Sequence, residues 1–183
     1  MLFNPKYNNI ELKDKNINLI YKNVFEKINN YMNFVKFSIE DTISKKVIHK
    51  FYIHSKINES SKELTEHFNK DRFLNIECAI EIEPKKREII VNKDSPCLFC
   101  SLPLIGSESH ILPFILNSND FETSTEREAI ILCGDEFIKD KKRNDKEIIS
   151  DVGINRFILK RSYELFNRVV NFLVIINLMI YIY

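Results

Sequence analysis

Apolar side chains recur every three or four residues between Asp14 and Phe34. They are Ile17, Ile20, Tyr21, Val24, Ile28 and Tyr31. This spacing is typical of an amphipathic helix, and aspartate is a residue type that caps helix N-termini. We therefore predict a helix over this range, with Asp14 as its N-cap.

The central part of the chain favours β-strands. Lys45–His54 is rich in β-branched and aromatic residues, whereas Asn58–Lys70 is polar and is expected to be a loop. In Phe73–Ile82 the apolar residues alternate with polar ones, so that one face of a strand carries Leu74, Ile76, Cys78, Ile80 and Ile82. A turn signal at Glu83–Lys86 precedes a second run, Glu88–Asn92, and the two runs predict a hairpin.

Two further apolar runs, Cys97–Leu102 and Ile111–Leu116, are expected to be short strands. Pro113 inside the second run indicates a sheet edge or a bulge, because proline cannot donate a ladder hydrogen bond. Thr123–Ile131 begins polar and becomes apolar, which predicts the start of a helix capped by Thr123 or Ser124.

A charged connector, Asp135–Lys146, leads to a long helix that is predicted from about Lys146 to the end of the sequence. Gly153 lowers the helix propensity of its middle part. The predicted fold class is α+β: an antiparallel β-sheet flanked by an N-terminal helix and a long C-terminal helix. We expect residues 1–145 to form an α+β domain, and residues 146–183 to form a helix with an apolar, truncated end.

Composition narrows the classes of function. Twenty-seven basic and 26 acidic residues give a net charge of +1, which provides no electrostatic basis for binding nucleic acid. Only three glycines are present, so a glycine-rich phosphate loop is almost excluded. The four cysteines follow no secretory signal in the first residues, which predicts a reduced, cytoplasmic setting.

The most informative stretch is Leu102–Ile130. It reads Leu-Pro-Leu, a turn at Gly106, an apolar run, and an Asn-Ser-Asn-Asp loop that leads into a charged segment. It resembles a segment of the sacsin-like branch of the ATP-driven chaperones, which are related to the ninety-kilodalton heat-shock proteins in the GHKL ATPase superfamily. The likeness covers most of Asn16–Val170, including Gly153-Ile154-Asn155, and Leu102–Arg127 is its specific part.

The resemblance implies a transducer region that lies downstream of a nucleotide-binding domain and places a basic residue against the ATP γ-phosphate. In the heat-shock relatives this arginine lies in a segment that ends Ser-Arg-Glu, and here Glu126-Arg127-Glu128 follows Asn117–Thr125. Arg127 is therefore the candidate catalytic residue, acting in trans, and the same loop is shaped by Asn117, Ser118 and Asn119. The alternative is a surface arginine paired with Glu128 or Asp120, beside ordinary turn residues.

The superfamily's own nucleotide pocket is not expected in this chain. Glu26 and Asn30 have the spacing of its Glu-x-x-x-Asn motif, and Asp151–Asn155 has half of its Asp-x-Gly-x-Gly motif. The two matches lie far apart without a glycine-rich lid between them, so chance explains both. We therefore expect no enzyme activity and no bound cofactor in this chain alone, ATP and magnesium belonging to the parent family.

The remaining candidate features have ordinary alternatives. Cys97 and Cys100 have the spacing of a zinc or redox pair, but a second ligand pair is missing, which favours structural thiols. His49, His54 and His67 show no ligand spacing. Val169–Tyr183 is uncharged but, at 15 residues, is shorter than the ~20 that span a bilayer, so a protein interface is favoured over a membrane.

Two functions follow as expectations. The first is a non-catalytic transducer fragment whose partner is the missing nucleotide-binding domain or another protein chain. The second is an interaction module that docks a partner or a membrane through its apolar C-terminal helix.

Overall fold

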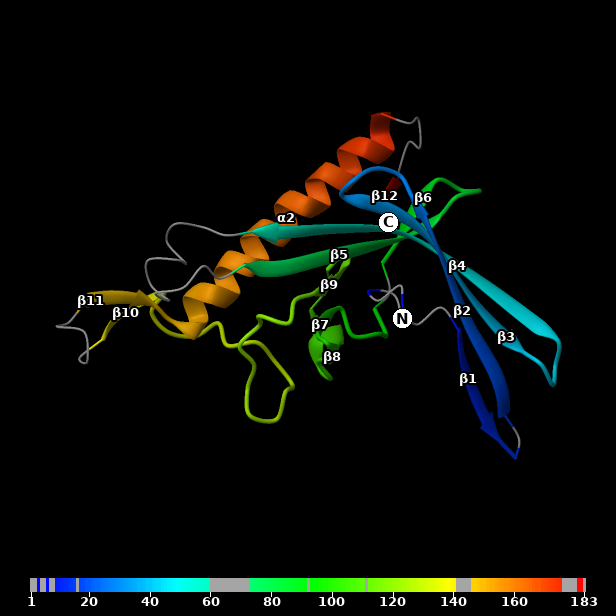
Figure 1. Ribbon diagram of the computed structural model, residues 1–183, viewed down its shortest axis with the longest axis horizontal. Coiled ribbons are helices and arrows are strands. Elements are labelled where there is room, and N and C mark those ends of the chain that lie inside the picture. Colours follow the sequence, from blue (N-terminus) through cyan, green and yellow to red (C-terminus); the bar gives the residue numbers. More distant parts are fainter. Residues whose placement is uncertain are drawn as a thin grey trace. The chain divides into compact units, whose positions relative to one another are not determined.

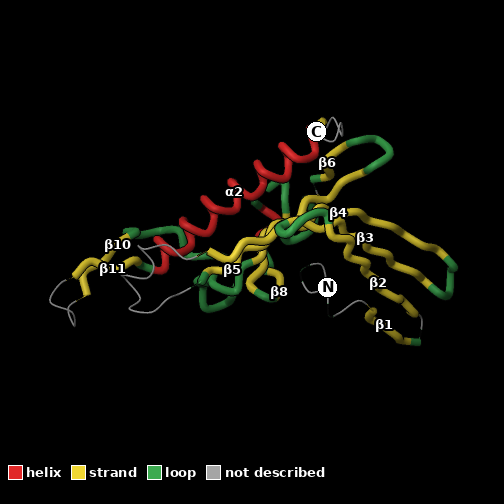
Figure 2. Tube along the Cα trace, turned by 45° about the horizontal axis from the view of Figure 1, so that its top comes forward, coloured by secondary structure: helices red, strands yellow, loops and turns green. Residues whose placement is uncertain are grey.

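The computed structural model describes residues 3, 6, 9–15, 17–59, 73–91, 93–110, 112–140, 146–175 and 181–182 (Figures 1 and 2). It confirms the α+β class: most strands are antiparallel, and one long helix, α2 (Asp151–Ile175), follows them. The strands are β1 (Asn9–Asp14), β2 (Ile17–Lys27), β3 (Met32–Asp41), β4 (Lys46–Glu59), β5 (Leu74–Glu83), β6 (Glu88–Ile90), β7 (Leu98–Cys100), β8 (Leu102–Pro103), β9 (Ile115–Asn117), β10 (Phe137–Asp140), β11 (Lys146–Ile149) and β12 (Tyr181–Ile182). A short 3₁₀ helix, η1, spans Ser107–Ser109.

The chain forms two compact units, each built from separate segments. The first unit contains Met1–Ser55, Ala79–Val91 and Arg168–Tyr183, and the second contains Lys56–Cys78 and Asn92–Asn167. Strands β4 and β5 and helix α2 therefore contribute residues to both units. The expected domain boundary at residue 145 stays a prediction.

The first unit contains antiparallel strands where an N-terminal helix was expected. The helix prediction over Asp14–Phe34 is wrong: β2 and β3 occupy this range, and Asp14 ends β1 instead of capping a helix. In β2 the apolar residues also alternate at the strand period, and Tyr21 and Phe25 each lie opposite an apolar residue of β3. These cross-strand pairs favour the strand over the helix that the same residues allow.

The predicted central strands are confirmed. The run Lys45–His54 lies almost entirely in β4, and the run Phe73–Ile82 lies in β5. The expected apolar face of β5 is fully or almost fully buried along its whole length. The predicted hairpin is also confirmed, since β5 and β6 pair antiparallel across a turn at residues 84–87. Of the expected loop Asn58–Lys70, two residues belong to β4 and the rest lie outside the described residues.

In the second unit, β9 lies between β5 and β7 and runs parallel to β7, with Leu98 opposite Leu116. The expectation that Pro113 marks a sheet edge or a bulge is wrong, because this proline precedes β9, which has a neighbour on both sides. The strand can be central because the proline does not take part in its ladder.

Three boundaries near the C-terminal helix differ from expectation. Thr123–Ile131 is not a helix start but a loop closed by a β-bridge between Thr123 and Ile130. The charged connector contains β10, which pairs with β11 as a hairpin. Lys146–Ile149 is β11, so the helix begins at Asp151. Ser150 caps it, because its Oγ accepts a hydrogen bond from the Gly153 amide at 3.1 Å.

The apolar C-terminal run, Val169–Tyr183, contributes to two elements, α2 and β12. Its first residues form the end of α2, where Val169 and Leu173 are buried in the first unit, and residues 181–182 pair in parallel with β6. Residues 176–180 and 183 lie outside the described residues. Among the described helices, none has the length and hydrophobicity to span a membrane.

Candidate functional site

Arg127 lies at the tip of a hydrogen-bonded turn in the second unit. The Ser124 carbonyl accepts a hydrogen bond from the Arg127 amide at 2.9 Å, and the Ser124 amide donates to the Ala129 carbonyl at 2.9 Å. The Ser124 Oγ also accepts from the amides of Glu128 and Ala129, at 3.2 and 3.4 Å. Arg127 itself has a left-handed backbone, with φ +57°. A helix cannot continue through such a residue, which is why the predicted helix start is absent.

The base of this loop is held by Asn155 in the second turn of α2. Asn155 is fully buried, and its Nδ2 donates to the carbonyls of Glu122 and Ile131 at 2.7 and 2.9 Å. Its Oδ1 accepts from the Glu122 amide at 2.9 Å. The loop ends also bond directly, since the Ile131 amide donates to the Glu122 carbonyl at 3.1 Å. One side chain of the helix therefore fixes both ends of the segment that carries Arg127.

The Arg127 guanidinium is exposed and anchored at one nitrogen. Its Nη2 donates to the Cys100 carbonyl at 2.8 Å. Among the described residues it forms no ion pair, so the expected alternative of a pairing with Glu128 or Asp120 is not what the structure contains. One edge of the guanidinium is therefore positioned by the backbone of Cys100.

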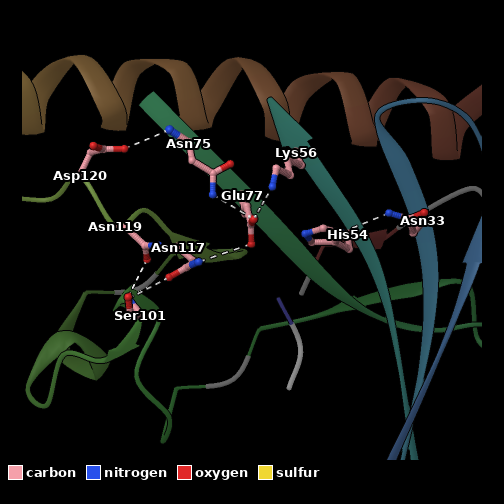
Figure 3. A network of polar contacts seen from close by, with 9 residues as sticks. All are labelled: Asn33, His54, Lys56, Asn75, Glu77, Ser101, Asn117, Asn119 and Asp120. Carbon is pink, nitrogen blue, oxygen red and sulfur yellow. Dashed lines mark hydrogen bonds and ion pairs between the residues drawn. The ribbon is translucent and has the colours of Figure 1, made fainter. Parts of the chain in front are cut away.

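The predicted loop residues Asn117, Ser118 and Asn119 lie at the end of β9, close to the Arg127 anchor. Asn117 Oδ1 accepts from the Ser101 amide at 3.3 Å, and Asn119 Oδ1 accepts from the Ser101 Oγ at 2.7 Å (Figure 3). Ser118 is fully buried, and its amide donates to the Phe99 carbonyl. These residues therefore brace the segment around Ser101, which directly follows Cys100. Their functional role stays a prediction.

A buried carboxylate, Glu77, contacts Asn117 of this segment. Sequence reasoning did not identify it as a candidate. Glu77 in β5 is only 4% exposed, and its carboxylate lies 3.3 Å from Lys56 Nζ (Figure 3). It also accepts from Asn75 Nδ2 at 3.1 Å and from Asn117 Nδ2 at 3.4 Å. A buried charge requires such partners, because its desolvation is costly. The only sequence signal was its place on the polar face of β5.

A second link joins β5 to the loop after β9. The Asn75 amide donates to an Asp120 carboxylate oxygen at 3.1 Å (Figure 3). With the Asn117–Glu77 contact, it fastens both ends of the Asn-Ser-Asn-Asp sequence to β5. The loop that precedes Arg127 therefore has a fixed base in the sheet of the second unit.

Cys97 and Cys100 have different surroundings. The Cys97 thiol is buried and donates to the carbonyls of Ser107 and His110, at 2.9 and 3.1 Å. Burial raises its pKa, and burial likewise raises the pKa of Cys78. Cys100 is half-buried, with its sulfur 3.7 Å from the Phe121 carbonyl. The described residues contain no cluster of three or more histidine, cysteine or acidic side chains with metal-binding geometry.

The residues of the two partial nucleotide motifs do not lie where the superfamily's pocket requires them. Glu26 lies in β2 and Asn30 in the bend after it, so they do not share a helix face. Asp151–Asn155 opens α2, where Asn155 holds the Arg127 loop. His49 shares a hydrogen bond with Ser38 Oγ at 2.9 Å, His54 is buried, and His67 lies outside the described residues.

No family model, curated protein or solved structure matches this chain.

Proposed function

We propose that this chain is a non-catalytic, transducer-like module that presents Arg127 to the phosphates of ATP held by another domain or protein chain. The observation that carries the proposal is the state of the Arg127 side chain: exposed, anchored at one nitrogen, and without an ion pair among the described residues. The resemblance of Leu102–Arg127 to the sacsin-like ATPases supplies the identity of the anion.

The local geometry supports this role for a physical reason. A guanidinium is a planar fork whose donors bind phosphate oxygens in pairs. The Cys100 carbonyl occupies one Nη2 hydrogen, so the remaining donors stay available and their direction is restricted. Restricting the side chain lowers the entropy that phosphate binding would otherwise cost.

The platform beneath the arginine is also braced by hydrogen bonds. Asn155 closes the loop at its base, and the turn around Ser124 closes it at its tip. A charge delivered to a partner's active site acts only if it is held within a fraction of an ångström of its productive position. The two sets of hydrogen bonds within the second unit support this requirement by closing the loop at its base and at its tip.

Under this proposal, ATP and magnesium are bound by the partner and not by this chain. Calorimetric titration of the chain with magnesium-ATP is therefore expected to show no saturable binding. Saturable binding that is lost in Glu26→Ala or Asn30→Ala would contradict the proposal, because the chain would then contain a nucleotide pocket of its own.

The arginine role is tested by mixing the chain with the nucleotide-binding domain of an intact sacsin-like ATPase. Wild-type chain is expected to raise the ATPase rate, and Arg127→Ala is expected to lose most of that increase. Arg156→Ala is the matched control, since Arg156 is also exposed but is already paired with Glu136 at 2.9 Å. Equal effects of wild type and Arg127→Ala would show that the proposal is wrong.

A second candidate is an interaction module that uses the apolar end of α2. Val174 and Ile175 are 54% and 78% exposed at adjacent positions, which favours a protein contact there. The test is the double substitution Val174→Ser with Ile175→Ser. It is expected to release a bound partner without unfolding the chain, and retention of the partner would contradict this function.

A further inference from the structure

The outermost strand of the first unit is an open sheet edge. Among the described strands, β1 has a hydrogen-bonded neighbour on one side only, β2 (Figures 1 and 2). All six of its residues are exposed. Ile10 and Leu12 are 41% and 50% exposed and share one face, whereas Glu11 and Lys13 share the other. An edge of this kind is a template for another strand unless its side chains oppose pairing.

The charges of β1 are not matched across the existing hairpin. Glu11 lies opposite Ile20, and Lys13 lies opposite Asn18. Glu11 and Lys13 form an ion pair with each other, at 2.8 Å along the strand, and both side chains are largely solvent-exposed. A lysine on an edge strand opposes pairing when it meets a lysine of a second copy. Here, an antiparallel second copy can place its Lys13 opposite Glu11 and its Glu11 opposite Lys13, so that the charges attract.

Symmetry restricts how two copies of β1 can pair. In an antiparallel edge-to-edge dimer the two-fold axis is perpendicular to the sheet, so directly opposed residues must lie on the same face. The pairing must then be centred on a residue. Among registers that keep five residues of β1 paired, one is centred on Glu11 and places two carboxylates opposite each other. The other is centred on Leu12 and places Glu11 opposite Lys13 twice.

We propose that β1 is a self-association surface that joins two copies of this chain antiparallel, with Leu12 opposite Leu12 of the second copy. The two copies form one continuous sheet. On the face that carries Ile10 and Leu12, the Leu12 pair lies at the centre, and Asp14 lies opposite Ile10 on either side of it. On the opposite face the two Glu11–Lys13 pairs provide complementary charge in this register and repulsion in the Glu11-centred one. The interface is small, so the dimer is weak and reversible.

The test is sedimentation velocity of the full chain over a concentration series at low ionic strength. Wild type is expected to dimerise reversibly. Glu11→Lys places two lysines opposite each other, and Lys13→Glu places two glutamates opposite each other. Because each change affects two symmetric pairs, the dimer dissociation constant of each single variant is expected to rise by about tenfold or more. The double variant Glu11→Lys with Lys13→Glu restores both pairs and is expected to recover dimerisation.

Thermal unfolding is the control for correct folding of the variants. The melting temperature is expected to change little in all three variants, because the Glu11–Lys13 pair is exposed. Three results would overturn the proposal: a wild type that stays monomeric, a dimer that tolerates both single substitutions, or a double variant that is no better than the singles. The last two results would show that any dimer uses another surface or another register.

Discussion

Asn155 and Glu122 are joined by two reciprocal hydrogen bonds. Asn155 Nδ2 donates to the Glu122 carbonyl at 2.7 Å, and the Glu122 amide donates to Asn155 Oδ1 at 2.9 Å. The same side chain also reaches the Ile131 carbonyl, at the other end of the loop. The start of α2 and the Arg127 loop are therefore one hydrogen-bonded assembly.

Replacing Asn155 with alanine is expected to destabilise the fold. The change removes three part-buried hydrogen bonds and leaves backbone groups of Glu122 and Ile131 without this partner. We expect a loss of about 2–4 kcal/mol in the free energy of unfolding, measured by urea denaturation. Asn167→Ala is the control, because Asn167 is an exposed asparagine of the same helix. An equal, small effect of both changes would contradict this role of Asn155.

Gly153→Ala is expected to destabilise the protein, although alanine is the better helix former. A Cβ at Gly153 would lie 2.4 Å from the Glu136 carbonyl oxygen and 2.6 Å from Ile149 Cγ1. Relief of this overlap requires the backbone to shift, at a cost of about 1–3 kcal/mol that exceeds the roughly 1 kcal/mol gained in helix propensity. Lys160→Ala, at an exposed position of α2, is the control. A higher melting temperature of Gly153→Ala would disprove the close approach.

Arg127→Gly is expected to separate stability from activity. Glycine adopts a left-handed backbone at little cost. The substitution therefore removes the steric strain at φ +57° together with the guanidinium group. We expect the free energy of unfolding to stay within about 1 kcal/mol of wild type, with any change toward higher stability. A large destabilisation in urea denaturation would mean that the bond to the Cys100 carbonyl holds the loop together.

Stability is expected to fall as the pH rises above about 9. Burial raises the pKa of Cys78, and burial and the Glu81 carboxylate raise the pKa of Tyr52, from ordinary values of 9.0 and 10.0. Above those values the unfolded chain releases protons that the folded chain retains, so proton release favours unfolding. Each group is expected to remove about 1.4 kcal/mol per pH unit until its folded pKa is reached.

This dependence is checked by urea denaturation at a series of pH values under reducing conditions. Cys78→Ala is expected to reduce the slope of stability against pH, because the buried thiol is then absent. A slope that is identical in wild type and Cys78→Ala would show that the Cys78 thiol ionises normally in the folded protein.

The elements that the sequence predicts well are those with a single consistent period. Strand β5 has an alternating pattern that fits no helix, and its predicted face is buried. Residues 17–31 fit both periods, and the partners of β2 in β1 and β3 decide between them. No local pattern contains that information, since the partners lie on a different part of the chain.

The candidate site divides in the same way. Arg127 is a candidate because of the resemblance. The local sequence of Thr123–Ile131 predicts a helix, because it contains helix-capping and charge signals. The left-handed backbone of Arg127 depends on hydrogen bonds around Ser124 and on Asn155 in α2. Glu77 was missed because a glutamate on a strand is ordinarily solvated, and its burial depends on strands that follow later in the chain.

We propose that Arg127 acts on ATP bound by a partner. This proposal is tested most directly by measuring the ATPase rate of a sacsin-like nucleotide-binding domain at saturating concentrations of this chain, with Arg127→Gly, Arg127→Lys and Arg156→Ala compared with wild type. We expect stimulation by wild type and Arg156→Ala, little by Arg127→Gly, and an intermediate rate for Arg127→Lys, whose single ammonium lacks the planar fork. Equal stimulation by wild type and Arg127→Gly would contradict it.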